Sequence, residues 1–148
     1  MLMANEDSES TQMIEGKFGQ GAYGPTVRLV LKSVAAAEQL RELFISARHA
    51  PEPILVTRQP GVRIDGVEEL RLIQESGVGP HAHLRRTGQS ERGQRLDWLA
   101  SPAGWSILAG LVDAFVKGRP GHQYLTSESH DDVLIEVSFG EESSAAGH

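Results

Sequence analysis

The chain has 148 residues, of which 14 are basic and 20 acidic, and its formal net charge at pH 7 is −6. It contains no cysteine, which excludes disulfide bonds, thiolate metal sites and thiol nucleophiles. The length predicts one domain, and the acidic balance argues against nucleic acid or an anionic membrane as the partner.

The two ends differ in composition from the segment between them. Residues 1–13 and 140–148 are polar and show no period, which predicts disordered tails around a single α+β domain at 14–139. The beginning of the chain lacks the basic and apolar stretches of a secretory signal, and no later stretch approaches membrane-spanning length. We therefore expect a cytoplasmic protein.

The first half predicts the order strand, helix, strand, strand. Residues 26–33 alternate apolar and polar side chains, as in a half-buried strand, and Ser33 is a good N-cap for a helix at 34–48. The apolar stripe of that helix is Ala36, Ala37, Leu40, Leu43, Phe44 and Ala47. Prolines end the helix, and strands are expected at 54–58 and 67–74 with turns between them.

The second half predicts the same order around another serine-capped helix. Ser101 followed by proline begins a helix that ends at Lys117. Its apolar stripe is Trp105, Leu108, Leu111, Val112 and Phe115. The other expected elements are an exposed strand at 81–87, a polar loop at 89–94, and strands at 95–100, 121–126 and 132–139.

This repeated order indicates either an internal duplication, with pseudo-repeats at 26–76 and 93–139, or two units that share a common pattern. With the helices aligned, the matched pairs are Leu31 with Leu99, Ser33 with Ser101, Ala35 with Ala103, Leu40 with Leu108 and Leu43 with Leu111. Under either alternative we predict the α+β class, with an antiparallel-rich sheet and two helices on one face.

The glycine-rich segment at 19–24 matches the glycine spacing of phosphate-binding loops. A dinucleotide loop follows a strand and opens a helix, whereas a proline and a strand follow this segment. The chain is also too short for a protein kinase and lacks its catalytic motifs. We interpret the segment as a mobile approach to the first strand.

Histidines are the best candidates for a metal site. His81 and His83 fall on one face of the predicted strand, and His122 joins them if the second half folds back. Duplicated strand-helix-strand modules are similar in topology to those of vicinal-oxygen-chelate metalloenzymes, although among the ligand positions of that family only the carboxylate on the final strand has a candidate here, Glu136. The alternative is that these histidines are exposed on an edge strand and bind nothing.

Other chemistry has little support in the residue pattern. The chain has no Gly-x-Ser-x-Gly motif, and no spacing of Ser, His and Asp specifies a triad, so we expect no enzymatic activity of that class. A local basic patch contains Arg85, Arg86, Arg92 and Arg95. These arginines either bind a carboxylate or phosphate or keep a loop soluble.

The segments Trp98–Trp105, Gly121–Leu125 and Asp132–Ser138 resemble small bacterial α+β proteins that act as immunity proteins in polymorphic toxin systems. The resemblance implies a non-enzymatic protein that binds and masks a toxin. An acidic protein favours a basic toxin as the partner. The residues that we expect at the contact surface are Glu128, Asp131, Asp132, Glu136, His122 and Tyr124.

Three functions therefore remain open at this point. The first is a protein-binding domain without a cofactor, which neutralises a toxin. The second is an enzyme or binding domain that uses a divalent transition metal at His81, His83 and His122. The third is a structural domain that forms a homodimer through an exposed strand edge.

Overall fold

The computed structural model describes residues 13–75, 82–126 and 133–140, which form two helices and two β-sheets. The predicted tails lie outside this part except for Met13 and Gly140. In chain order the elements are β1 (Ile14–Gly21), β2 (Gly24–Leu31), α2 (Val34–Ala47), β3 (Ile54–Leu55), the 3-10 turn η1 (Val56–Arg58), β4 (Val62–Asp65), β5 (Val67–Gln74), β6 (His83–Ser90), β7 (Gly93–Ala100), α3 (Pro102–Val116), β8 (Gly121–Tyr124) and β9 (Leu134–Phe139).

Both helices begin at the serines that the sequence predicts. The Ser33 hydroxyl accepts a hydrogen bond from the Ala36 amide at 3.1 Å, and the Ser101 hydroxyl accepts one from the Gly104 amide at 3.0 Å. All six predicted stripe residues of α2 are buried. In α3 four of the five are buried and Leu111 is half-buried against the same core. Neither helix in the described part is long and apolar enough to cross a membrane.

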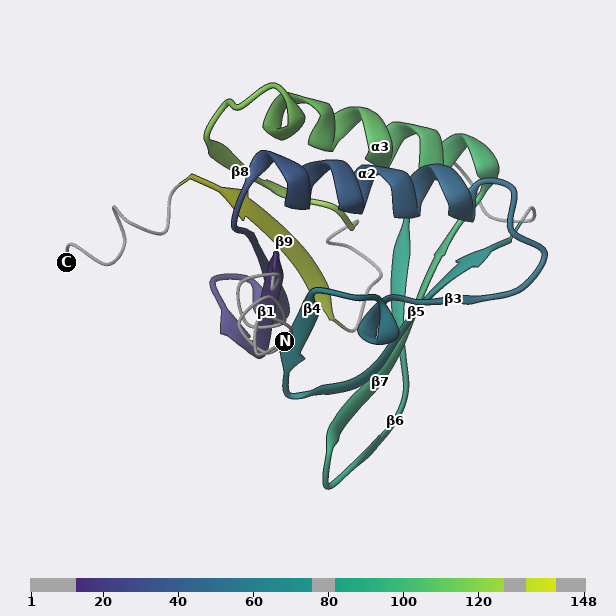
Figure 1. Cartoon of the computed structure of the whole chain (residues 1–148). Coiled ribbons are helices and arrows are strands. Elements are labelled where there is room, and N and C mark those ends of the chain that lie inside the picture. Colours follow the sequence, from purple (N-terminus) through teal and green to yellow (C-terminus); the bar gives the residue numbers. More distant parts are fainter. Residues whose placement is uncertain (1–12, 76–81, 127–132, 141–148) are drawn as a thin grey trace, which may run out of the picture.

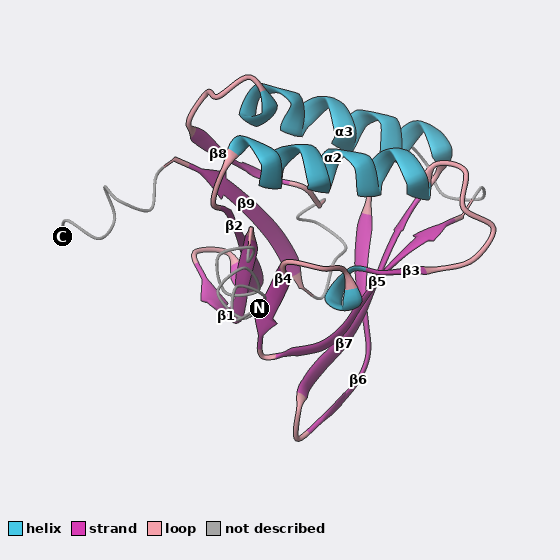
Figure 2. Ribbon diagram, in the orientation of Figure 1, coloured by secondary structure: helices cyan, strands magenta, loops and turns pink. Residues whose placement is uncertain are grey.

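The strands form a five-stranded sheet in the order β4-β1-β2-β9-β8 and a four-stranded sheet in the order β3-β5-β7-β6. The helices α2 and α3 lie side by side on one side of both sheets (Figures 1 and 2). The predicted α+β class with two helices is confirmed. Four strand pairs are antiparallel and three are parallel, so the sheets are mixed rather than purely antiparallel.

The two sheets share one arrangement of strands. The order β1-β2-β9-β8 has the same pairing directions, step by step, as the order β6-β7-β5-β3. Each sheet therefore combines a hairpin from one half of the chain with the closing strands of the other half. The strand β4, on the outer side of β1, has no counterpart in the described part of the four-stranded sheet. Duplication of the gene segment itself stays a prediction.

This shared arrangement changes one of the predicted residue pairs. The strands β2 and β7 are the second strands of the two hairpins, and they begin at Gly24 and Gly93. When these first residues are aligned, Leu31 corresponds to Ala100 rather than to Leu99. Lys32 is the extra residue between β2 and its helix cap, which explains the shift by one. Because side chains alternate along a strand, the shift decides which face a residue occupies.

Two predictions about loops are wrong. Gly19 and Gly21 belong to β1, and the segment 19–24 is the tip of the β1–β2 hairpin rather than a loop before the first strand. Residues 89–94 are not a loop either, because only Glu91 and Arg92 form the turn between β6 and β7. Gly24 and Gly93 have φ angles of 125° and 127°, which a residue with a side chain rarely adopts.

Candidate functional site

The outer face of the five-stranded sheet, which is turned away from the helices, carries a row of polar side chains. Lys17 on β1 lies opposite Arg28 on β2, Arg28 opposite Glu136 on β9, and Glu136 opposite Tyr124 on β8. The neighbours of Arg28 along β2 are buried in the core beneath the helices. Since residues on a strand alternate between its faces, the row points to solvent.

Charges in this row are only partly paired. The Arg28 Nε lies 3.4 Å from the Glu136 Oε1, and the two side chains are 62% and 18% exposed. Lys17 forms no ion pair within 4.0 Å in the described part of the chain. The exposed cations Arg28 and Lys17 contribute little to folding and are available for contact with a partner.

Two tyrosines lie at the β8 end of the row, and one of them, Tyr124, belongs to it. Tyr23, in the β1–β2 turn, is 66% exposed, more than any other large apolar or aromatic side chain in the described residues. Its ring lies edge-on to that of Tyr124, with 5.8 Å between centroids. His122 lies two residues from Tyr124 on β8 and opposite Ser138 of β9. The site thus combines aromatic, cationic and acidic side chains on one face.

Of the six predicted contact residues, the structure brings three together on this face: Glu136, His122 and Tyr124. Glu128, Asp131 and Asp132 lie outside the described residues. Sequence reasoning missed Tyr23, Lys17 and Arg28 as site residues. The available signal for Tyr23 was an aromatic residue between turn glycines, where a buried position is uncommon.

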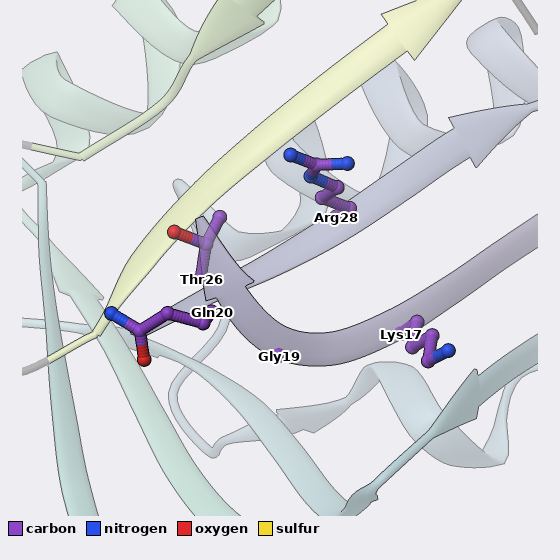
Figure 3. A pocket seen from close by; sticks show the side chains of 5 residues that line it. All are labelled: Lys17, Gly19, Gln20, Thr26 and Arg28. Carbon is purple, nitrogen blue, oxygen red and sulfur yellow. The ribbon is translucent and has the colours of Figure 1, made fainter. Parts of the chain in front are cut away.

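A hollow of about 240 Å³ opens between β1 and β2 on the same face; its lining residues are Lys17, Gly19, Gln20, Thr26 and Arg28 (Figure 3). A Cβ atom at Gly19 would have no heavy atom within 4 Å, so the missing side chain leaves space over this strand. The short Thr26 side chain donates its hydroxyl to the Gly24 carbonyl at 2.9 Å and leaves the space free. The hollow is therefore open, and two cations, Lys17 and Arg28, are among its lining residues.

The corresponding row of the four-stranded sheet is built differently. Asp97 is the fifth residue of β7, and Arg28 is the fifth residue of β2. Asp97 is 6% exposed and lies opposite Arg85 on β6 and Arg71 on β5. Arg71 donates from Nε and Nη2 to the two carboxylate oxygens at 2.8 and 3.0 Å, and Arg85 lies at 4.0 Å. Hydrogen bonding to Asp97 raises the pKa of Arg71 above its usual value. The Arg71–Asp97 pair therefore joins β5 to β7 within the fold.

The predicted basic patch does not form a single binding site. Arg85 faces Asp97, and Arg95 lies 3.6 Å from a carboxylate oxygen of Glu68. The guanidinium of Arg86 lies 6.0 Å from the centre of the Phe18 ring. Arg92 is exposed in the hairpin turn. Three of the four arginines thus contact groups of the chain itself.

The histidines proposed as metal ligands are placed on different sheets. His83 lies on β6, the edge of the four-stranded sheet, and His122 on β8, the edge of the five-stranded sheet. His81 falls outside the described residues. Within residues 13–75, 82–126 and 133–140, no three His, Asp or Glu side chains lie close enough together to hold a metal ion.

Comparisons with known protein families, with curated protein sequences and with solved structures find no match to this chain. The site is therefore interpreted from its own geometry.

Proposed function

We propose that this chain is a non-enzymatic protein-binding domain and that it binds through the outer face of the five-stranded sheet. The observation that carries the proposal is the exposed Tyr23 ring packed against Tyr124, beside the Arg28–Glu136 pair. Tyrosine and arginine are enriched among the residues that dominate binding energy at protein interfaces. An aromatic pair offers a large contact area at a small cost in side-chain entropy.

A basic partner fits the charge of the chain. The net charge of −6 attracts a cationic protein over a distance and increases the rate of its encounter. Together with the resemblance to immunity proteins, this charge leads us to propose a toxin as the partner, and neutralisation of that toxin as the result of binding. Glu136, next to the tyrosines, is the described acidic residue that we expect to contact it.

The first test is site-specific photo-crosslinking of the full chain in its native cells. A crosslinking amino acid replaces Tyr23 in one variant and Ile107 in the other; Ile107 is 50% exposed on α3 and lies away from the site. We expect one protein to be captured at position 23 and not at position 107. Equal capture at both positions would contradict the proposed binding face.

The captured protein is then purified and its affinity measured by calorimetry. Tyr23→Ala is expected to weaken binding by more than about tenfold, as for a residue at the centre of an interface, and Ile107→Ala to leave it unchanged. If the partner is a toxin, co-expression with the wild-type chain protects cells and co-expression with Tyr23→Ala protects them less. Unchanged affinity of Tyr23→Ala, with the fold intact by circular dichroism, would overturn the proposal.

Self-assembly through a strand edge has weaker support. The strand β6 has eight residues and no neighbour on its outer side among the described strands. It carries two exposed arginines and a β-bulge near Thr87, and both features oppose pairing with a second copy. Sedimentation of the purified chain tests this alternative, which predicts a dimer in the absence of any partner.

A further inference from the structure

The central residue of the outer row carries opposite charges in the two sheets, and this difference is relevant to ligand binding. In the four-stranded sheet the carboxylate of Asp97 lies between two cations, Arg71 and Arg85. In the five-stranded sheet the corresponding central residue is Arg28, with Glu136 on one side and Lys17 on the other. The first row has alternating charges, whereas the second places two cations next to each other.

The space above these rows also differs. In the four-stranded sheet, Gly88 of β6 lies opposite Arg95, the third residue of β7. In the five-stranded sheet, Gly19 of β1 lies opposite Thr26, the third residue of β2. A Cβ atom at Gly88 would lie 3.0 Å from the Arg95 guanidinium, so that side chain occupies the space. Thr26 is too short to do the same over Gly19. The hollow is therefore open in the five-stranded sheet and filled in the other.

We propose that the hollow binds the carboxylate of an aspartate or glutamate side chain that the protein partner presents. This inference rests on the proposed function and deepens it. Lys17 and Arg28 lie on neighbouring strands at opposite sides of the hollow, with their charged ends pointing away from each other, and Gln20 lies at its rim (Figure 3). On binding, the Lys17 ammonium and the Arg28 guanidinium would turn toward the carboxylate and donate to its two oxygens. A carboxylate here restores the alternation of charges that Asp97 provides in the other sheet.

The charge of the chain makes such a contact specific. A local pair of cations in a protein of net charge −6 attracts an acidic side chain only at close range. A mostly basic partner with one acidic residue at its centre would therefore be held in one orientation, because any other alignment places like charges together. The hollow thus determines the register of binding, and the tyrosines provide contact area.

The test uses small probes and needs no partner. N-acetylglutamate N-methylamide, whose only charge is the side-chain carboxylate, is titrated into the full chain at constant ionic strength, and the amide signals of residues 17–28 are followed by NMR spectroscopy. N-acetylglutamine N-methylamide, which has nearly the same shape and no charge, is the control probe. We expect saturable shifts of these amides with the glutamate probe and none with the glutamine probe.

Variants locate the probe in the hollow. Lys17→Gln removes an exposed cation and is expected to weaken binding by at least about threefold, a loss typical of a solvent-exposed ionic contact. Gly19→Val fills the hollow with a residue suited to a strand and is expected to abolish the shifts. Arg63→Gln removes an arginine from β4 on the same face, outside the hollow, and is expected to have no effect.

Several results would overturn the inference. These are equal shifts with both probes, shifts elsewhere in the chain, or unchanged affinity of Lys17→Gln. Because Lys17→Gln is an exposed substitution, it keeps the test valid if Gly19→Val does not fold. Inorganic phosphate is titrated in parallel, and binding of phosphate without binding of N-acetylglutamate N-methylamide would contradict the carboxylate class. If the carboxylate fails while Tyr23→Ala still weakens partner binding, only this inference fails. If the carboxylate binds while Tyr23→Ala has no effect, the proposed function fails instead.

Discussion

The Arg28–Glu136 pair and the Asp97–Arg71 pair occupy corresponding places in the two sheets, with the charges exchanged. Asp97 is 6% exposed and accepts two short hydrogen bonds, whereas Arg28 is 62% exposed and approaches Glu136 only to 3.4 Å. A buried charge needs a partner at close range, while an exposed pair contributes little to folding. The comparison indicates that one sheet uses this row to stabilise the fold, whereas the other leaves the cation of its pair exposed to solvent.

The largest effect is expected where the carboxylate is buried. Asp97→Ala leaves Arg71 without its two hydrogen bonds and is expected to cost about 2–3 kcal/mol, below the range for fully buried pairs because Arg71 is partly exposed. Glu136→Ala, its counterpart, is expected to cost less than about 1 kcal/mol. Urea unfolding measures both changes. Equal losses would show that the two rows are energetically alike.

Exchanging the charges within each pair is the next largest test. Arg28→Glu combined with Glu136→Arg keeps a pair with one exposed and one largely buried side chain and is expected to change the free energy of unfolding by less than about 1 kcal/mol. Asp97→Arg combined with Arg71→Asp places a long side chain at a buried position and is expected to cost about 1–3 kcal/mol. Thermal unfolding by circular dichroism distinguishes the two exchanges. A destabilised first exchange would mean that the exposed row also supports the fold.

The two glycines sharpen the comparison on a smaller scale. Gly19→Ala meets no atom within 4 Å and is expected to stabilise the protein by about 0.5 kcal/mol, since alanine loses less backbone entropy than glycine in a strand. Gly88→Ala forces the Arg95 guanidinium away from its place and is expected to gain nothing or to destabilise slightly. Chemical unfolding of both variants against the wild type provides the measurement, and a gain at Gly88 would contradict the filled hollow.

The smallest effect is expected at a third ionic contact, which joins the helices outside both rows. Asp113 on α3 accepts from Lys117 at 3.1 Å and from Arg41 on α2 at 2.8 Å. These hydrogen bonds hold the pKa of Asp113 below its ordinary value of 3.8, and the bond from Lys117 has the larger effect. Its contribution is therefore complete above about pH 4 and decreases as the pH falls through the lowered pKa.

Asp113→Asn removes this dependence. As the pH falls below about 4, the variant is expected to lose less stability than the wild type. Urea unfolding at several pH values tests this. Parallel pH profiles would show that Asp113 has the same pKa in the folded and unfolded chain.

The features that sequence predicted well are local. The caps at Ser33 and Ser101 depend on hydrogen bonds across three residues, and the α2 stripe depends on the period of one helix. The strand β1 was missed because its glycines and charges, from Glu15 to Gly21, hide the alternation of apolar residues. Its pairing with β2 makes the pattern visible, because Ile14 and Phe18 then oppose Leu31 and Val27.

The candidate site was predicted only in part for a related reason. His122, Tyr124 and Glu136 lie close together in the sequence, and the antiparallel pairing of β8 with β9 places them on one face. Lys17 and Arg28 come from the other half of the chain and reach this face only because β2 pairs with β9. No local pattern indicates that pairing.

Composition and periodicity alone determined that this chain forms an α+β domain with two serine-capped helices, and that it contains no cysteine chemistry. The tertiary structure decided which half contributes strands to which sheet, which carboxylate is buried and which hollow is open. These outcomes depend on parallel contacts between strands far apart in the chain, β2 with β9 and β5 with β7. Such contacts form only after long loops have closed, so no short stretch of residues encodes them by itself.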